Sequence, residues 1–332
     1  MQYKNASLYL IFVIYLITIC FPSLVFSSDQ HKDKSQYSSF VHEPIQPIPE
    51  VIITNQPVVD LGRKLFEDPR LSADNSISCA HCHPLGNAGV DGLKFSFGIG
   101  GAIGNLNTPT VYNSGLHFTQ FWDGRAETLE DQIEGPIHDP KEMGSNWEQV
   151  IQKIKADTDY LETFTKLYPQ GVSPESIKNA IATFERSLIT PNGRFDQFLR
   201  GKKDAISEEE LQGYILFKNY GCSSCHQGVA VGGNMYEKMG VHRDYFADRG
   251  GVNEADYGRF NATGVEEHRF EFKVPSLRNV ELTGPYFHDG SKETLEEAVN
   301  TMAKYQLGRS IKKNDVKLIV AFLKTLTGEF NQ

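Results

Sequence analysis

The chain has 332 residues, of which 39% are hydrophobic and 23% are charged, proportions typical of a globular rather than a disordered or membrane-embedded protein. Its length allows two domains whose cores need no disulfide or structural metal in order to fold. The formal net charge of -9 argues against a nucleic-acid-binding protein, because neutralising phosphates requires clustered Lys and Arg. An acidic surface would suit a basic protein partner, or could serve only solubility.

The N-terminus is typical of an export signal. Lys4 is followed by a nearly continuous apolar run from Ala6 to Phe26 and then by small residues. This order predicts a secretory signal peptide over residues 1–27 and therefore an exported protein, which the resemblance described below would place in the periplasm. The alternative is an uncleaved membrane anchor, because the apolar run approaches the ~20 residues that span a bilayer. Residues 28–57 are polar and contain prolines, which predicts a flexible leader.

Four of the five cysteines form two CxxCH motifs, one in each half of the chain. Two thiols one helical turn apart can each form a thioether with a haem vinyl group, while the adjacent imidazole ligates the iron. A zinc site is an alternative, but structural zinc pairs usually lie closer in sequence and need no His after both pairs. A redox disulfide would not explain the repeated His. The pattern predicts two covalent c-type haems, held by Cys79, Cys82 and His83 and by Cys222, Cys225 and His226.

Helical periodicity and capping signals predict a mainly α fold of two cytochrome c-like helical domains, residues 58–192 and 193–332, each with one haem. No stretch has the alternating pattern of a strand. The segment Thr190–Lys203 is predicted to be a linker, and Gly328 is expected to cap the last helix. The expected helices, in chain order, are Ser173–Leu188, a helix from Ser207 towards Tyr220, one from Thr294 through Met302, and Asp315–Leu326.

The second axial ligand of each iron decides between electron transfer and catalysis. Met302 is the candidate thioether ligand of one haem, although its position alone favours packing on the apolar face of its helix, and only the family resemblance below reverses this. Trp122, Gln132 and Glu142 lie between the two motifs. A carboxylate beside an open iron could move a proton within bound peroxide. Taken singly, Glu142 is typical of a solvated surface residue and Trp122 of a core residue.

Beyond these motifs, the chain resembles the bacterial di-haem cytochrome c peroxidases and their relatives in the MauG group. The resemblance extends from about Pro57 to Gly328. It rests on both CxxCH motifs and on the ordered segments Asn107–Val111, Gln120–Arg125, Gly135-Pro136, Gly193–Gly201, Leu277–Val280, Leu282–His288 and Ala321–Gly328.

The resemblance implies a role for each haem. The haem at His83 would be the low-potential peroxidatic site, with Glu142 as the acid and base catalyst and Gln132 as its polar companion. The haem at His226, with Met302 as its distal ligand, would be the high-potential site of electron entry.

The resemblance also implies features between the two halves. Trp122 would lie between the haems as the electron bridge. A calcium ion would be bound at the domain interface by the side chain of Asn107 and the backbone carbonyls of Thr283 and Pro285, since oxygen donors suit this hard cation. Related enzymes are often dimers, which suggests a homodimer.

At one position the sequence departs from the family. Many members have a distal His in the loop after the first CxxCH, whereas here the loop Phe95–Gly101 has Ile99 at the matching place. The later histidines of this half, His117 and His138, are more easily explained as surface or core residues. We therefore expect the first haem to be five-coordinate or water-bound at rest.

The function implied by the resemblance is reduction of hydrogen peroxide to water, with electrons from a small redox protein, either a cytochrome c or a cupredoxin. The first alternative is a MauG-like enzyme that oxidises residues of a partner protein. In MauG-like proteins a Tyr replaces the methionine ligand, so Met302 favours the peroxidase. The second alternative is a non-catalytic di-haem electron carrier, against which the Gln120–Glu142 cluster argues.

Overall fold

Helices dominate residues 43–330, the part of the chain that the computed structural model describes, and this confirms the mainly α fold. The predicted signal peptide and the first part of the predicted leader lie outside these residues. None of the described helices is both long and apolar enough to cross a membrane. The α-helices are α1 (Gln56–Phe66), α2 (Cys79–Cys82), α3 (Leu129–His138), α4 (Trp147–Lys155), α5 (Thr158–Leu167), α6 (Pro174–Ser187), α7 (Arg194–Leu199), α8 (Glu208–Tyr220), α9 (Tyr245–Arg249), α10 (Phe260–Thr263), α11 (Leu295–Gln306) and α12 (Lys313–Lys324).

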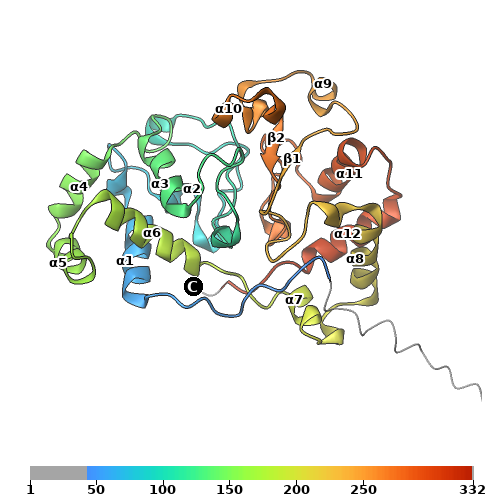
Figure 1. The fold of residues 1–332 in the computed structure, drawn as a ribbon, viewed down its shortest axis with the longest axis horizontal. Coiled ribbons are helices and arrows are strands. Elements are labelled where there is room, and N and C mark those ends of the chain that lie inside the picture. Colours follow the sequence, from blue (N-terminus) through green and yellow to red (C-terminus); the bar gives the residue numbers. More distant parts are fainter. Residues whose placement is uncertain (1–42, 331–332) are drawn as a thin grey trace, which may run out of the picture. The chain divides into compact units, whose positions relative to one another are not determined.

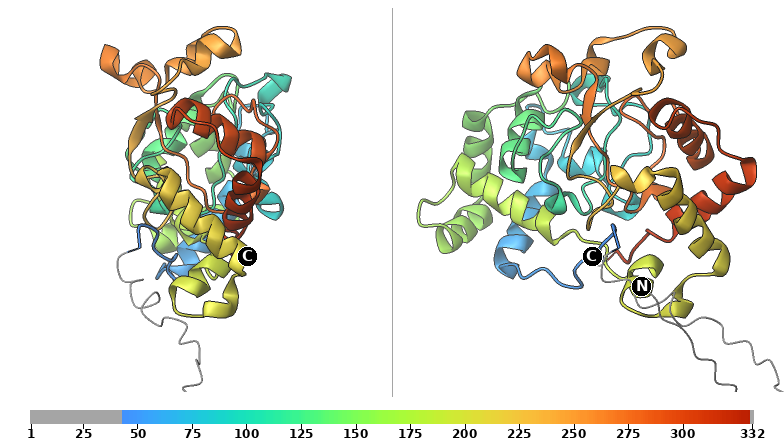
Figure 2. Two further views of the ribbon diagram at one scale, coloured as in Figure 1. Left: turned by 90° about the vertical axis from the view of Figure 1, so that its right-hand side faces the viewer. Right: turned by 45° about the vertical axis from the view of Figure 1, so that its right-hand side comes forward.

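The helices gather in two groups, as Figure 1 shows. Helices α1 and α3–α6 lie together, and α7, α8, α11 and α12 form the second group; the views of Figure 2 agree. The first group shares a continuous apolar core that includes Leu65, Ile133 and Phe184. In the second group the aromatic rings of Phe195 and Tyr214 pack with centroids 4.6 Å apart. Each group contains one CxxCH motif.

Local capping signals explain where most predicted helices begin. Ser173, Ser207 and Thr294 each accept a hydrogen bond from the backbone three residues later, in a reciprocal capping box. The predicted starts of α6, α8 and α11 are therefore confirmed. The last helix, α12, begins and ends two residues earlier than expected.

Three expectations about local structure were wrong. The expected linker contains α7, because Phe195 and Phe198 are buried in the second core. Gly328 does not cap α12, because the C-cap of that helix is Thr325. Gly328 instead packs against the backbone, where a Cβ would lie 1.9 Å from the Thr190 carbonyl oxygen. Two short strands, β1 (Tyr236–Lys238) and β2 (Glu271–Lys273), form an antiparallel pair, and three-residue strands are too short to show alternation.

The same helix crossing is built twice. Helix α1 precedes the first CxxCH and packs on α6, and α8 precedes the second and packs on α12 (Figures 1 and 2). A Cβ on Gly62 would lie 1.9 Å from the Ala180 carbonyl oxygen, and one on Gly213 would lie 1.9 Å from that of Leu318. Only glycine allows the two backbones to approach so closely.

An aromatic pair follows each glycine crossing. Phe66 lies four residues after Gly62 and packs against Phe184 with ring centroids 5.3 Å apart. In the second group, Phe217 packs against Phe322 at 5.2 Å. In each half, a helix that precedes the CxxCH motif in sequence is therefore fixed by a glycine contact and two rings, closely before the motif in the second half (α8 ends at Tyr220) and thirteen residues before it in the first (α1 ends at Phe66).

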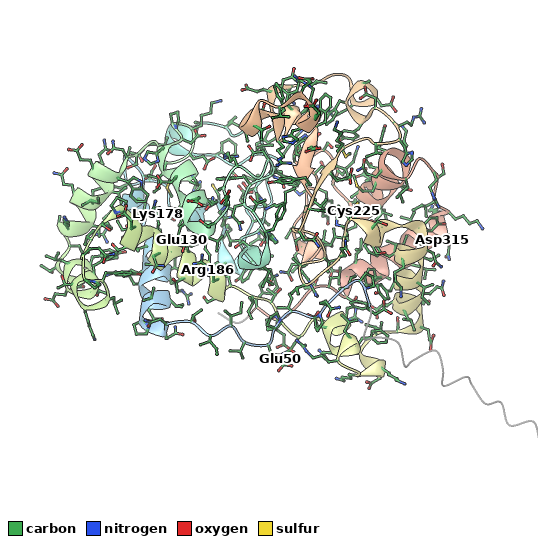
Figure 3. The ribbon with its side chains drawn as sticks, in the orientation of Figure 1. Glu50, Glu130, Lys178, Arg186, Cys225 and Asp315 are labelled. Atoms are coloured by element: carbon green, nitrogen blue, oxygen red, sulfur yellow. The ribbon has the colours of Figure 1, made fainter. Side chains whose placement is uncertain are left out.

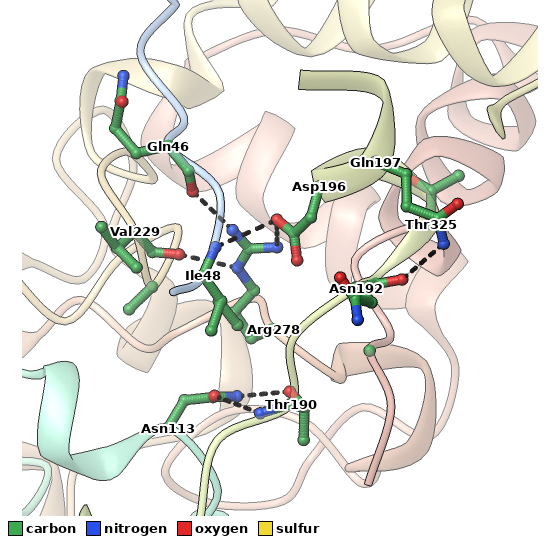
Figure 4. Close-up of polar contacts among 12 residues, drawn as sticks. Gln46, Ile48, Asn113, Thr190, Asn192, Asp196, Gln197, Val229, Arg278 and Thr325 are labelled. Carbon is green, nitrogen blue, oxygen red and sulfur yellow. Dashed lines mark hydrogen bonds and ion pairs between the residues drawn. The ribbon is translucent and has the colours of Figure 1, made fainter. Parts of the chain in front are cut away.

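A buried ion pair joins three remote segments (Figure 4). The guanidinium of Arg278, which is 1% exposed, donates to Asp196 in α7 over 2.7 Å and to the Val229 carbonyl over 2.8 Å. It also donates to the Gln46 carbonyl over 2.8 Å. Residues 43–48 of the predicted leader thus pack on the second half, where Ile48 is buried.

Substitution of either crossing glycine tests the helix packing. In an ordinary helix, Gly→Ala would be stabilising by up to about 1 kcal/mol. We expect Gly62→Ala and Gly213→Ala instead to lower the free energy of unfolding by about 1–3 kcal/mol, because the new methyl group overlaps a carbonyl. Gly86→Ala is the control, since a Cβ there has no neighbour within 4 Å. Urea unfolding would contradict the packing argument if all three variants matched the wild type.

Candidate active site

The first CxxCH motif forms the short helix α2, which places the thiols of Cys79 and Cys82 one turn apart. His83 follows directly, and its Nδ1 donates to the Gly89 carbonyl over 3.0 Å. This bond leaves Nε2 as the free ligating nitrogen. Burial lowers the pKa of His83 and so keeps the imidazole in the neutral form that binds metals.

The second motif repeats this arrangement in the 3₁₀ turn Cys222–Ser224. The Nδ1 of His226 donates to the Val231 carbonyl over 3.4 Å, and burial lowers the pKa of His226 to about 4. Figure 3 labels Cys225, which lies in the second group of helices. The four motif cysteines form no disulfide, and no group of three or more His, Cys, Asp or Glu within residues 43–330 is arranged to hold a metal ion. Paired free thiols beside a carbonyl-bonded histidine fit covalent haem attachment at both motifs.

Helix α3 positions Gln132, which is half-buried. The helix starts in a capping box at Thr128 and is tied to α6 by two ion pairs (Figure 3). In these pairs Arg186 binds Glu130 with two bonds of 2.8 and 2.6 Å, and Lys178 binds Glu134 at 2.5 Å. The helix that presents Gln132 is therefore fixed to the core of the first half.

The turn after α3 presents Glu142. Its amide donates to the Asp139 carbonyl over 3.0 Å, and the next residue, Met143, is buried. Glu142 is solvent-accessible. Surrounding protein atoms nevertheless partly desolvate its carboxyl, and this desolvation, together with the negative charge of Asp139, raises the pKa of Glu142. The positive charge of Arg125 lowers the pKa and so opposes this rise. A carboxyl that is both accessible and partly desolvated can reach a small substrate and still hold a proton.

The loop after the first motif packs on this turn. The amide of Ile99 donates to the Glu142 carbonyl over 2.8 Å, and a Cβ on Gly98 would lie 1.9 Å from the Lys141 carbonyl oxygen. The Ile99 side chain packs against the apolar core of the first half. At the position where many family members have a distal His, this protein thus has the aliphatic side chain of Ile99, which packs against other protein side chains.

Trp122 lies in a loop of the first half that reaches the second. Its indole nitrogen donates to the Asn107 carbonyl over 2.8 Å. Its ring packs on an aromatic cluster of the second half that includes Phe272, and lies 6.3 Å from the ring of His288. Trp122 is therefore fixed between elements of both halves.

The remaining predicted residues are placed as follows. Met302 is half-buried on α11 in the second group of helices. The amide nitrogen of Asn107 donates to the Leu93 carbonyl over 2.9 Å, which leaves its Oδ1 available. The backbone of Asn107 is bonded to that of His288 over 2.8 Å, close in sequence to Thr283 and Pro285.

Three buried polar groups had no recognisable signal in the sequence. His288 donates to Asp256, which Arg249 also binds. Lys273 is 7% exposed, and Glu185 is 6% exposed with one unpartnered oxygen. Burial raises the pKa of Glu185 to about 8 and lowers that of Lys273 to about 8. Burial of a charged side chain depends on contacts remote in sequence, so no local pattern reveals it.

Two CxxCH motifs with identically oriented histidines define a protein that carries two c-type haems. A family model described as di-haem cytochrome c peroxidase matches residues 56–204. The chain is 48% identical over 289 residues to cytochrome c551 peroxidase of Nitrosomonas europaea, covering 87% of this chain and 85% of that protein. The chain therefore belongs to the di-haem cytochrome c peroxidase family, which confirms the family and enzyme class predicted from the sequence.

Other relatives agree. The chain is also 48% identical over 290 residues to cytochrome c peroxidase Ccp of Escherichia coli, covering 87% of this chain but 62% of that longer protein. Among solved structures, a MauG-like protein associated with microbial copper homeostasis has a TM-score of 0.76 at 28% identity. That match covers 86% of this chain and 94% of the other.

The buried carboxyl of Glu185 should make stability depend on pH. Between about pH 4.5 and 8 the folded protein keeps a proton that the unfolded chain has lost, so stability falls as pH rises. The expected slope is about 1.4 kcal/mol per pH unit. Glu185→Gln should remove this slope, whereas Glu162→Gln on the exposed face of α5 should keep it. Urea midpoints measured from pH 5 to 8 check this, and equal slopes in all three proteins would show that Glu185 is ionised when folded.

Proposed function

We propose that this chain is a periplasmic peroxidase that reduces hydrogen peroxide to water with electrons from a small redox protein, a cytochrome c or a cupredoxin. The cytochrome c peroxidases at 48% identity support this reaction. The observation that carries the proposal is the accessible Glu142 carboxyl with its raised pKa, beside a loop that holds no imidazole. An electron carrier would need no such acid.

The first half would contain the reaction site. Its haem would be attached at Cys79 and Cys82 and ligated by His83. When bound, the haem supplies the iron at which peroxide is reduced. Glu142 accepts the proton of the inner peroxide oxygen and returns it to the outer oxygen, which then leaves as water. Gln132 on α3 supplies an amide that orients the substrate.

The second half would receive the electrons. Cys222, Cys225 and His226 would hold its haem, and the Met302 thioether would be the distal ligand, which raises the reduction potential. Trp122 contacts elements of both halves and would be the electron bridge between them. We propose the domains as residues 58–192 and 193–332, with a homodimer as the assembly.

A calcium ion is proposed between the halves. Its ligands would be the free Oδ1 of Asn107 and the carbonyl oxygens of Thr283 and Pro285. The backbone bond from Asn107 to His288 brings these two segments together. Oxygen donors without thiols or imidazoles suit this ion.

Glu142→Gln tests the acid and base role. The amide keeps the size of the side chain but cannot carry the proton, so peroxide turnover should fall by about 10²–10⁴-fold. The optical spectra of both haems should stay unchanged. Glu148→Gln, on the exposed side of α4, should retain full turnover with a reduced cytochrome. A Glu142→Gln enzyme with wild-type turnover would refute the assignment.

The loop at Ile99 predicts an open first haem in the fully oxidised protein. Turnover should begin without prior reduction, because no protein ligand has to leave the iron. Ile99→His should add an imidazole to this loop and produce a lag that pre-reduction removes. Stopped-flow peroxide assays and resting spectra check both statements. Two low-spin, six-coordinate, protein-ligated haems in the oxidised wild type would contradict them.

A further inference from the structure

Two buried nitrogen-bearing side chains meet beside Trp122, and no ion pair to a described carboxylate is formed by either; Asp123 acts on Lys273 only through its charge at longer range. They are Lys273, at the end of β2, and His117, in the segment that leads to Trp122. Neither side chain has a part in the peroxide chemistry described above. Both lie next to residues that bond to Gly233: Phe118 donates to its carbonyl, and the Val274 carbonyl accepts from its amide.

Lys273 is a buried cation with too few acceptors. Its ammonium donates to the Thr119 carbonyl over 3.1 Å, and none of the described carboxylates lies within ion-pair distance of it. An ammonium has three donors, so two lack a partner in the described residues. Burying an unpaired charge is unfavourable, so such a site is expected to hold an anion.

His117 presents two further polar atoms at the same place. Both its ring nitrogens are buried and have no hydrogen-bond partner among the described residues. Burial is the main reason why the pKa of His117 lies well below its usual value, and the positive charge of Lys273 lowers it further. The two residues lie near each other, because Lys273 donates to the Thr119 carbonyl, two residues after His117. A neutral imidazole beside a cation can donate one hydrogen bond to an anion.

The backbone connects this pair to the second motif. A Cβ on Gly233 would lie 2.5 Å from the His117 ring, and the Gly233 amide donates to the Val274 carbonyl over 2.8 Å. Gly233 is two residues after Val231, whose carbonyl accepts from His226. The pair therefore lies beside the segment that orients the proximal histidine of the second haem.

We propose that Lys273 and His117 bind a carboxylate of the haem attached at Cys222 and Cys225. A haem of this type has two propionate groups, and a carboxylate would satisfy the unpartnered donors of both side chains. The alternative source is a small carboxylate from solution. The inference rests on haem attachment and not on peroxide turnover, so it is tested without peroxide.

The test is a spectroelectrochemical titration of both haems in the full-length holoprotein. Lys273→Met leaves the carboxylate charge uncompensated, which favours the oxidised haem. At a fixed potential the ratio of oxidised to reduced second haem should rise by about tenfold. Lys273→Arg should behave like the wild type. Lys317→Met, which removes an exposed lysine of α12, is the matched control and should also be unchanged.

His117 gives an independent pair of variants, which carries the test if Lys273→Met does not fold. His117→Leu should shift the same haem in the same direction by a smaller factor, and His117→Asn, whose amide can donate, should restore the wild-type value. Unchanged potentials in both Lys273→Met and His117→Leu would overturn the proposal. A shift in the reduction potential of the first haem alone would overturn the assignment of this carboxylate site to the second haem.

Added acetate distinguishes the two sources of the carboxylate. If the haem supplies it, the wild-type potential should not change with acetate at constant ionic strength. A potential that depends on acetate in the wild type, but not in Lys273→Met, would show that the site takes a carboxylate from solution and would overturn the haem assignment.

Discussion

Three backbone hydrogen bonds between the halves set the geometry on which the function depends. Phe118 donates to Gly233 over 2.9 Å, Lys273 to Trp122 over 2.8 Å, and Asn107 to His288 over 2.8 Å. Because they join main chains, they fix the register of the whole 107–122 segment and not just one side chain. This register places Trp122 against the aromatic cluster of the second half. Gly233 is required there, since a side chain would collide with His117.

Features encoded by neighbouring residues could be predicted from the sequence. Capping signals identified the starts of three helices, Ser173 followed by a proline for α6 and capping boxes for α8 and α11, because an N-cap side chain bonds to a backbone amide only three residues away. The CxxCH motifs, equally local, indicated the cysteines and histidines proposed to hold the haems. Glu142 and Trp122 had no local signature, and only the similarity of longer segments to a known family singled them out.

Features set by remote contacts could not be predicted in this way. The segment that holds α7 has a linker-like composition, but Asp196 in it pairs with Arg278, more than eighty residues later. Gly328 looked like a helix cap, whereas its role is to approach the Thr190 carbonyl. Lys273 lies in a three-residue strand, where nothing nearby in sequence indicates that the ammonium is buried. Each depends on tertiary packing that local propensity does not encode.

In the function proposed above, one scaffold supports two tasks. Both have a glycine crossing of two helices, an aromatic pair beyond it, and a proximal histidine bonded to a carbonyl a few residues later. These shared parts can attach a haem but cannot distinguish catalysis from electron transfer. In the proposed function, the distinction would come from what each half adds: an accessible carboxyl and an aliphatic loop in the first, a thioether and a buried cation in the second. Because these additions come from turns and helices outside the crossing, they can change without disturbing the cores, so function in this fold is decided by the site and not by the scaffold.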